Sequence, residues 1–325
     1  MADHGLPVLY ALFVWWFSTG AILYLDGLPA RTFRWSMLGA TALTVLALYG
    51  LVASCDDTSL AGAYCAFTCA LMIWGWHEMS FLMGFVTGSR REACAAVCGG
   101  WRHFWHATQT ILHHELAIAA TAAMMVALTW GGTNQVGTWT FIVLWVMRVS
   151  AKLNVFLGVP NLTEEFLPEH LKYLKSFISR KPMNLLFPVS VTGGTIVACL
   201  LIQRAAASGT GSFDATAFTF VAALLTLAVL EHWFLVLPVP DAALWSWGLR
   251  SRDVELPSRA EGVISPDVTM ARSQPATGCN HPSERRTHHD LIPPGAGLGH
   301  NRSCQRVGGN HELRRLLPVP ARQPS

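Results

Sequence analysis

The chain has 325 residues, of which 52% are hydrophobic and only 13% are charged, and its formal net charge is +3. Soluble domains contain about 25% charged residues, so this composition excludes a soluble globular protein. The small positive charge identifies no partner by itself, because in a membrane chain the informative quantity is where the positive residues lie.

Seven apolar segments fill most of the first 240 residues, and each is long enough to cross a bilayer. A membrane-spanning helix needs about 20 mostly apolar residues. We therefore predict an all-α integral membrane bundle of about seven transmembrane helices. The segments are 6–25, 35–53, 60–86, 104–130, 138–159, 185–202 and 215–237.

The loops between these segments alternate in charge. The alternate loops contain Arg204 as their one basic residue, whereas nine basic residues follow the first, third and fifth segments. These nine are Arg31, Arg34, Arg90, Arg91, Arg102, Lys172, Lys175, Arg180 and Lys181. Because positive residues stay on the cytoplasmic side, we predict an N-terminus outside and a C-terminus in the cytoplasm.

The composition changes after Arg250. Residues 251–325 are rich in Pro, Gly, Ser, Arg and His and have no periodic apolar face. Such a segment cannot bury enough apolar surface to offset the entropy of ordering. We predict a transmembrane domain at residues 1–250 and a disordered cytoplasmic tail at residues 251–325.

The longest loop between segments, residues 160–184, has an amphipathic pattern. Pro168 suits the first turn of a helix, and Leu171, Leu174 and Ile178 recur at helical spacing. We expect this helix to lie along the cytoplasmic interface, with its lysines near lipid phosphates. It would serve either as a linker or as a docking surface for a partner.

Histidines and charged residues interrupt the apolar segments. A charged side chain in mid-bilayer costs about 2.5–3.5 kcal/mol, so we expect these residues to pack together. We predict one functional cluster of His77, Glu115, Glu231 and His232 with Arg148. The whole polar set is His77, Glu78, His106, His113, His114, Glu115, Arg148, Lys152, Asn154, Glu231 and His232.

Three interpretations of this polar set are open. In the first, ion pairs and hydrogen bonds fix the helix packing, since Arg148 and Lys152 need carboxylate partners. In the second, nitrogen and carboxylate ligands bind a transition metal, although the Glu-x-x-His spacing of di-iron bundles is missing. In the third, His106 or His113 is the axial ligand of a tetrapyrrole metal. The candidate metal ligands are His77, Glu78, His113, His114, Glu115, Glu231 and His232.

A long motif gives more specific information. The segment GVPNLTEEFLPEHLKYLKSF at residues 158–177, followed by RKPMNLLFPVS at residues 180–190, resembles the signature of the photosynthetic complex assembly protein family PuhE. The Trp-His-Glu element at residues 76–78 and the Glu-His-Trp element at residues 231–233 fit it too, and the resemblance covers roughly residues 6–250. The motif positions are Asn161, Thr163, Glu164, Pro168, His170, Asn184 and Pro188.

The resemblance implies a multi-pass protein in the inner membrane, cytoplasmic or intracytoplasmic, of an anoxygenic phototroph. It implies an assembly factor for the photosynthetic reaction centre and core antenna that acts through bacteriochlorophyll handling or supply. The expected partners are membrane lipids, reaction-centre or light-harvesting subunits, other assembly factors and pigment, but no nucleic acid. The alternative is a membrane metalloenzyme that acts on a bacteriochlorophyll precursor or a quinone at the His/Glu site. The irregular ligand spacing favours the assembly factor, and no catalytic residue follows from the resemblance.

Overall fold

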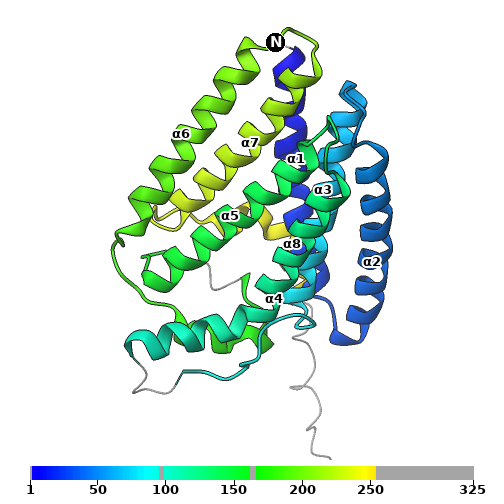
Figure 1. The fold of residues 1–325 in the computed structure, drawn as a ribbon. Helices are drawn as coiled ribbons and strands as arrows, with labels where there is room; N and C mark the ends of the chain where they lie inside the picture. The colour runs from blue at the N-terminus through cyan, green and yellow to red at the C-terminus, as the bar shows by residue number, and fades with distance from the viewer. Residues whose placement is uncertain (1, 95–98, 162–165, 254–325) are drawn as a thin grey trace, which may run out of the picture. The chain divides into compact units, whose positions relative to one another are not determined.

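The computed structural model describes residues 2–94, 99–161 and 166–253, and every regular element in these ranges is a helix (Figure 1). The described residues all belong to one compact unit. The predicted tail begins at residue 251, but residues 251–253 are helical. The rest of the tail, from residue 254 onward, and two motif positions, Thr163 and Glu164, lie outside the described residues. The elements are α1 (Ala2–Asp26), α2 (Ala30–Ala53), α3 (Leu60–Leu82), α4 (Gly100–Leu128), α5 (Val136–Leu157), η2 (Glu169–Phe177), α6 (Leu186–Ala207), α7 (Phe213–Phe234), η3 (Asp241–Trp245) and α8 (Ser246–Asp253).

Among the described helices, six are long and apolar enough to cross a membrane, namely α1, α2, α4, α5, α6 and α7. The chain is therefore a multi-pass helical membrane protein. The predicted third span corresponds to α3, which is 23 residues long and is not among the six. More than half of the α3 residues are buried, including His77 and Glu78. The crossing of α3 and the orientation of the bundle stay predictions.

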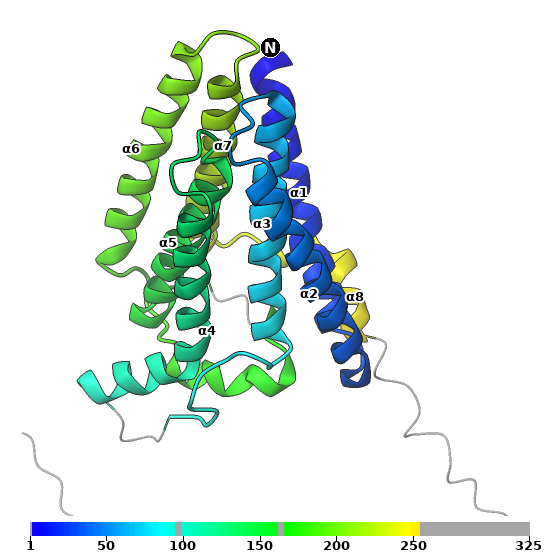
Figure 2. The ribbon, with the colours of Figure 1, turned by 45° about the vertical axis from the view of Figure 1, so that its right-hand side comes forward.

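The outer helices α2 and α6 lie on opposite sides of the bundle, and α2 packs on α3 while α6 packs on α7 (Figures 1 and 2). Their outward faces are apolar: Tyr49 on α2 is 75% exposed, and Val189 on α6 is 66% exposed. Apolar faces of this kind suit contact with lipid chains, because lipid tails are as apolar as the side chains that face them.

The half of the bundle nearest the N-terminus has a tightly packed aromatic core. The rings of Phe67 on α3 and Phe220 on α7 stack with centroids 4.3 Å apart, and Tyr64 meets Phe220 edge-on at 4.8 Å. Small residues on α3 bring the neighbouring helices close. Ala63 and Ala66 are at most 1% exposed.

Helix α4 bends near its middle, so that its first turns lie across the lower end of the bundle and the rest rises through it (Figures 1 and 2). The preceding loop is hydrogen-bonded to the bend: the His114 N–H donates to the Thr87 carbonyl at 2.8 Å, and the Arg90 N–H donates to the Gln109 carbonyl at 3.2 Å. A Cβ at Gly88 would lie 2.0 Å from the Gln109 oxygen. Only glycine allows this approach, and groups that compete for the helical hydrogen bonds are a known cause of kinks.

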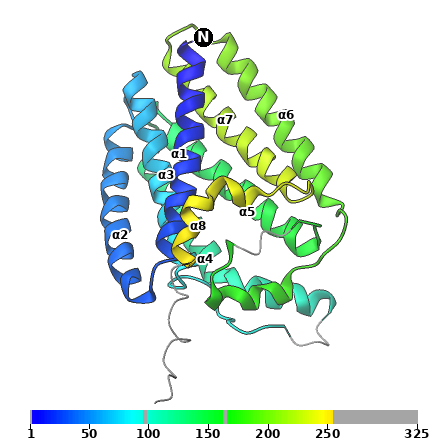
Figure 3. The ribbon, with the colours of Figure 1, turned by 180° about the vertical axis from the view of Figure 1, so that it is seen from behind.

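The chain returns along α1 after α7. Helix α8 lies beside the second half of α1 (Figure 3), where a Cβ at Gly248 would be 2.4 Å from the Gly20 carbonyl oxygen. An ion pair of 2.8 Å between Arg252 and Asp26 fixes the end of α8. This return places Trp245 of η3, which is buried, against the inside of the bundle.

The amphipathic segment after α5 is confirmed, but it is a 3₁₀ helix, η2, instead of the predicted α-helix. Its bonds close over three residues, as in the bond from the Leu171 N–H to the Pro168 carbonyl at 3.0 Å. Leu171 and Phe177 are buried, whereas Lys172 is half exposed and pairs with Glu169. The 3₁₀ helix therefore has an apolar side that packs on the bundle and a charged side, with Lys172, that is exposed.

Candidate ligand cavity in the transmembrane bundle

A cavity of about 520 Å³ lies between α1, α3, α4, α5 and α7, with residues of η2 and η3 in its wall. Its volume is in the range of about 300–1,000 Å³ that small-molecule sites have. The wall is mostly apolar and rich in rings: Trp15, Trp74, Phe81, Phe104, Phe156, Phe166, Phe177 and Trp245. A cavity of this size and composition suits a large apolar ligand with aromatic character.

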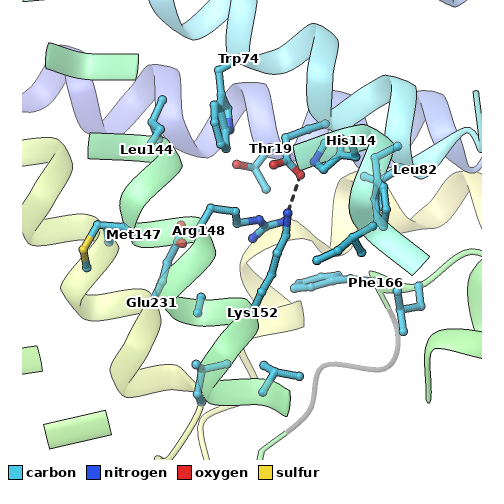
Figure 4. Close-up of a pocket in the computed structure, with 18 of the residues that line it drawn as sticks. Thr19, Trp74, Leu82, His114, Leu144, Met147, Arg148, Lys152, Phe166 and Glu231 are labelled. Atoms are coloured by element: carbon cyan, nitrogen blue, oxygen red, sulfur yellow. Dashed lines mark hydrogen bonds and ion pairs between the residues drawn. The ribbon is translucent and has the colours of Figure 1, made fainter. Parts of the chain in front are cut away.

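Two positively charged residues of α5, Arg148 and Lys152, lie in the wall of this cavity. Arg148 extends into the cavity and donates to the Glu78 carboxylate at 3.0 Å (Figure 4), and 45% of its side-chain surface is accessible. Lys152, one turn later, donates to Glu115 at 2.6 Å. These contacts form the carboxylate partnerships that the four-residue spacing of Arg148 and Lys152 predicted. Pairing of this kind is how a bundle tolerates ions away from water.

A third carboxylate, Glu231 on α7, also lines the cavity and lies close to Arg148 (Figure 4). Its Oε1 accepts a hydrogen bond of 2.7 Å from the indole N–H of Trp15 on α1. Its neighbour His232 is 1% exposed and also lines the cavity. The His232 Nε2 lies 3.0 Å from the Ser150 hydroxyl, and its Nδ1 lies 2.8 Å from the Ala228 carbonyl oxygen.

His114 differs from the other polar residues of the cavity wall. It is fully buried on α4, it lines the cavity, and neither ring nitrogen has a hydrogen-bond partner among the described residues. Buried polar groups are normally hydrogen-bonded, so an orphan of this kind needs an explanation. A neutral imidazole with a free nitrogen at the edge of a cavity is able to coordinate a metal centre of a bound ligand.

The predicted site residues do not all meet at the cavity. Glu78, His114, Glu231 and His232 line it, whereas Glu115 reaches it only through its bond to Lys152. His77 lines a smaller cavity of about 150 Å³ and contacts the Thr121 hydroxyl at 3.0 Å. His77 and His114 are neighbours, with ring centroids 6.4 Å apart.

The two histidines predicted as tetrapyrrole ligands are placed differently. His106 and His113 are not among the described residues that line the cavity, and His113 is exposed. Successive residues of a helix point about 100° apart, because one turn takes 3.6 residues. The helical spacing of His106, Thr110 and His113 favours His113 in the sequence, whereas in the structure His114 faces the cavity and His113 faces outward.

The candidate metal ligands do not gather into a metal centre. Within the described ranges, no group of three or more His, Cys, Asp and Glu side chains is arranged to hold a metal ion. Glu78 and Glu115 are instead paired with the cations of α5. The observed arrangement is an ion-pair and hydrogen-bond network around a cavity.

The motif residues in the loop after α5 mainly secure helix ends. The Asn161 amide donates to the carbonyl oxygens of Phe234 at 2.8 Å and Leu237 at 3.1 Å, at the C-terminal end of α7. Carbonyls at a helix end have no partner within the helix and must find one elsewhere. Asn161 supplies it, so this part of the motif positions the end of α7 that carries Glu231 and His232.

Asn184 joins the end of α5 to the start of α6. Its amide donates to the carbonyls of Asn154 at 3.1 Å and Gly158 at 3.0 Å, while its Oδ1 accepts from the backbone N–H groups of Leu186 and Phe187. The second pair of bonds satisfies the free donors of the first turn, as a helix cap does. Pro188 follows in the same turn, where a missing N–H is tolerated.

The motif positions in and before η2 lie beside the α3–α4 connection. Pro168 directly precedes η2, and the His170 ring packs so close to Gly84 that a Cβ there would be 3.1 Å away. Partial burial of the ring lowers the pKa of His170, a hydrogen bond with the Leu82 backbone opposes this effect, and the positive Arg91 adds to it. This contact holds η2 against the lower end of α3.

Several residues of the cavity wall had no signal in the sequence. Trp15 fits an interfacial aromatic belt equally well, and Leu174 and Phe177 fit an interfacial helix. Gly88 sets the bend that carries His114, but a loop glycine by itself predicts no contact with a distant helix. These assignments depend on long-range contacts alone.

Apolar helices around an inner cavity with paired charges define a multi-pass helical membrane protein with a candidate ligand-binding site. The chain belongs to the family described as Protein of unknown function (DUF3623), which matches residues 1–255. It is 42% identical over 272 residues to a Rhodobacter capsulatus protein described as an uncharacterized 30.4 kDa protein in the puhA 5′ region. That match covers 82% of this chain and 97% of the relative. No solved structure matches the chain.

Proposed function

We propose that this protein is a non-enzymatic assembly factor for the photosynthetic reaction centre and core antenna of an anoxygenic phototroph, and that its cavity holds a bacteriochlorophyll-type pigment. The gene position of the Rhodobacter capsulatus relative, in the puhA 5′ region, supports a role linked to photosynthesis. The resemblance of residues 158–190 to the PuhE signature supports assembly as that role. The membrane is then the photosynthetic inner membrane, and the partners are pigment-binding subunits and lipids.

The observation that carries the proposal is the unpartnered His114 in an aromatic cavity. Its side chain is 0% exposed, and both ring nitrogens lack a partner among the described residues. A tetrapyrrole bound there would supply a central metal able to accept one nitrogen ligand. Coordination would give His114 the partner that a buried imidazole otherwise lacks.

The remaining wall residues provide shape and polarity. The rings of Trp15, Trp74 and Phe81 offer flat apolar surfaces, which suit an extended aromatic ligand because ring pairs add about 0.5–1.5 kcal/mol beyond area burial. The Arg148–Glu78 pair places a polar group at the edge of this apolar space. Such a site combines a broad apolar wall with a few fixed polar contacts, as ligand pockets generally do.

The test compares two adjacent histidines in the full-length protein. His114→Ala and His113→Ala are expressed in a phototroph that lacks its own copy, and each protein is purified in mild detergent. We expect a chlorin absorption band with the wild type and with His113→Ala, and loss of the band with His114→Ala. Photocomplex absorption in the membranes should fall in parallel for His114→Ala alone.

Protein amount and melting temperature are measured beside the spectra, so that loss of pigment is separated from loss of protein. Equal pigment in the two variants would contradict the role of His114. Absence of any chlorin band from the wild-type protein, isolated from pigmented membranes at normal yield, would contradict the pigment-binding proposal as a whole.

A further inference from the structure

Helix α3 has a glycine, Gly75, near the middle of the face that lines the cavity. The residues of this face recur at intervals of three and four, as positions on one side of a helix do, and they are Leu71, Trp74, Gly75, Glu78 and Leu82. Glycine is unfavourable inside a helix, because it loses more backbone freedom on folding than any other residue. A glycine at this place therefore needs a reason in its surroundings.

Contacts between helices do not supply that reason. A Cβ at Gly75 would find its nearest neighbour among the described residues, the Ile22 Cδ1, at 3.8 Å, which is an ordinary van der Waals distance. A Cβ at Gly137 on α5 would instead lie 2.4 Å from Leu51, so that glycine is needed for the packing of two helices. The protein itself has room for a side chain at Gly75, and Gly75 lines the cavity.

The wall beside Gly75 combines small side chains with large rings. Ser18 and Thr19 on α1 are small, and Trp15 and Trp74, from the same two helices, line the same cavity (Figure 4 shows Thr19 and Trp74). Where a helix has no side chain, its backbone is open to close approach by a ligand. A flat ring can therefore lie directly on the backbone of α3 at this position.

Resting on the proposed function, we infer that Gly75 is a ligand contact and that its missing side chain provides space for the pigment. The edge of the tetrapyrrole ring lies against the α3 backbone at Gly75, and a larger residue there would occupy the same volume. His114 is a second sign of an occupant, because it lines the cavity from α4 and its ring nitrogens have no hydrogen-bond partner among the described residues. Position 75 thereby limits the width of the ring system that the cavity admits.

The experiment changes the size of the residue at position 75. The full-length protein in phosphatidylcholine nanodiscs is titrated with a magnesium chlorin methyl ester. Binding is followed by the chlorin absorption shift and by quenching of tryptophan fluorescence, and empty nanodiscs correct for partition into lipid. We expect Gly75→Ala to weaken binding by about tenfold and Gly75→Leu by about 100-fold or more, because each added group overlaps the ligand.

The same Gly75→Ala variant should have the opposite effect on the protein without ligand. Alanine is the better helix former, and the described atoms leave room for the added methyl group. We expect the melting temperature of the ligand-free protein, measured by circular dichroism, to rise by about 2 °C. A gain in stability together with a loss of affinity separates a ligand contact from damage to the fold.

Gly39→Ala is the matched control. Gly39 is exposed on α2, and a Cβ there meets no atom of the described residues within 4 Å. The substitution brings the same gain in helix propensity, but Gly39 is not among the described residues that line the cavity. It should raise the melting temperature by a similar amount and leave the affinity for the chlorin unchanged.

Wild-type affinity in folded Gly75→Ala and Gly75→Leu would overturn this inference while pigment binding stands. A melting temperature of Gly75→Ala below that of the wild type would assign the glycine to helix packing and overturn it as well. Failure of the chlorin to bind the wild type would overturn the proposed function itself, and the role of Gly75 with it.

Discussion

The two halves of the bundle differ in what fills them. In the half near the N-terminus, Phe67 and Phe220 stack at 4.3 Å, and the neighbouring positions on α3 are fully buried alanines. In the other half, the same helices α3 and α7 line a cavity of about 520 Å³, to which they contribute Glu78 and Glu231. One helix pair thus provides close packing at one end and a polar hollow at the other.

This difference separates stability from binding within one fold. Close packing of rings and small residues provides most of the attraction between helices in a membrane, where apolar burial contributes little. Charged residues and an open cavity oppose it, because ions need partners and voids lose contacts. A firmly packed half therefore allows the other half to contain a cavity and a buried His114 that has no hydrogen-bond partner among the described residues.

The largest expected effect is on reporter fusions, each of which should be active on one side of the membrane and inactive on the other. The positive-inside rule predicts that the basic loops, and with them the end of the bundle that contains the cavity, lie on the cytoplasmic side. A periplasmic reporter fused after residue 57 should then be active. A reporter fused after residue 175 should be active only in the cytoplasm. Alkaline phosphatase and green fluorescent protein fusions in whole cells measure this. The reverse pattern would move the cavity to the other face of the membrane.

Phe220→Ala should cause the largest loss of stability in the packed half. Phe220 is 0% exposed and contacts three other rings, and deleting a buried phenyl ring costs about 3–5 kcal/mol. Unfolding of the detergent-solubilised protein, followed by circular dichroism in denaturant, measures the change. Phe13→Ala, at a position that is 57% exposed, is the control and should cost little. Equal losses in both variants would remove the distinction between core and lipid-facing positions.

Gly88→Ala tests whether the bend of α4 positions His114. The added methyl group would meet the Gln109 oxygen at 2.0 Å, and overpacking of this kind costs about 1–3 kcal/mol. We expect a moderate loss of stability together with loss of copurified pigment. Gly99→Ala is the matched control, because a Cβ there meets no atom of the described residues within 4 Å. Normal pigment content in Gly88→Ala would show that the bend is not needed for binding.

The smallest expected effect is a pH dependence of the packing of η2 against the end of α3. The pKa of His170 in the folded protein is lowered from 6.5, mainly by burial. Protonation therefore favours the state in which η2 is detached. Docking of η2 is strongest above pH 6.5 and weakens as the pH falls below that value.

Hydrogen exchange of residues 169–177, corrected for the intrinsic pH effect, should show more opening at pH 5.5 than at pH 7.5. His170→Gln should remove this difference, because glutamine does not titrate in this range. A pH response that persists in His170→Gln would assign it to another group.

Part of the site could be predicted from residue spacing. Arg148 and Lys152 lie one turn apart on one helix face and carry charge into an apolar span, so carboxylate partners were required. The structure provides them as Glu78 and Glu115. The predicted cluster of His77, Glu115, Glu231 and His232 with Arg148 is found only in part, because His77 and Glu115 do not line the cavity that contains the other three.

The sequence by itself determined the class of protein and the helical membrane bundle, because span length and apolarity follow directly from bilayer thickness. It also determined the amphipathic character of residues 169–178, which depends only on local periodicity. The tertiary structure alone decided that His114 faces the cavity instead of His113. That choice depends on the rotation of α4 and on its bend at the hydrogen bond between Thr87 and His114. Contacts between residues far apart in the chain leave no local pattern, so only folding brings the wall of the cavity together.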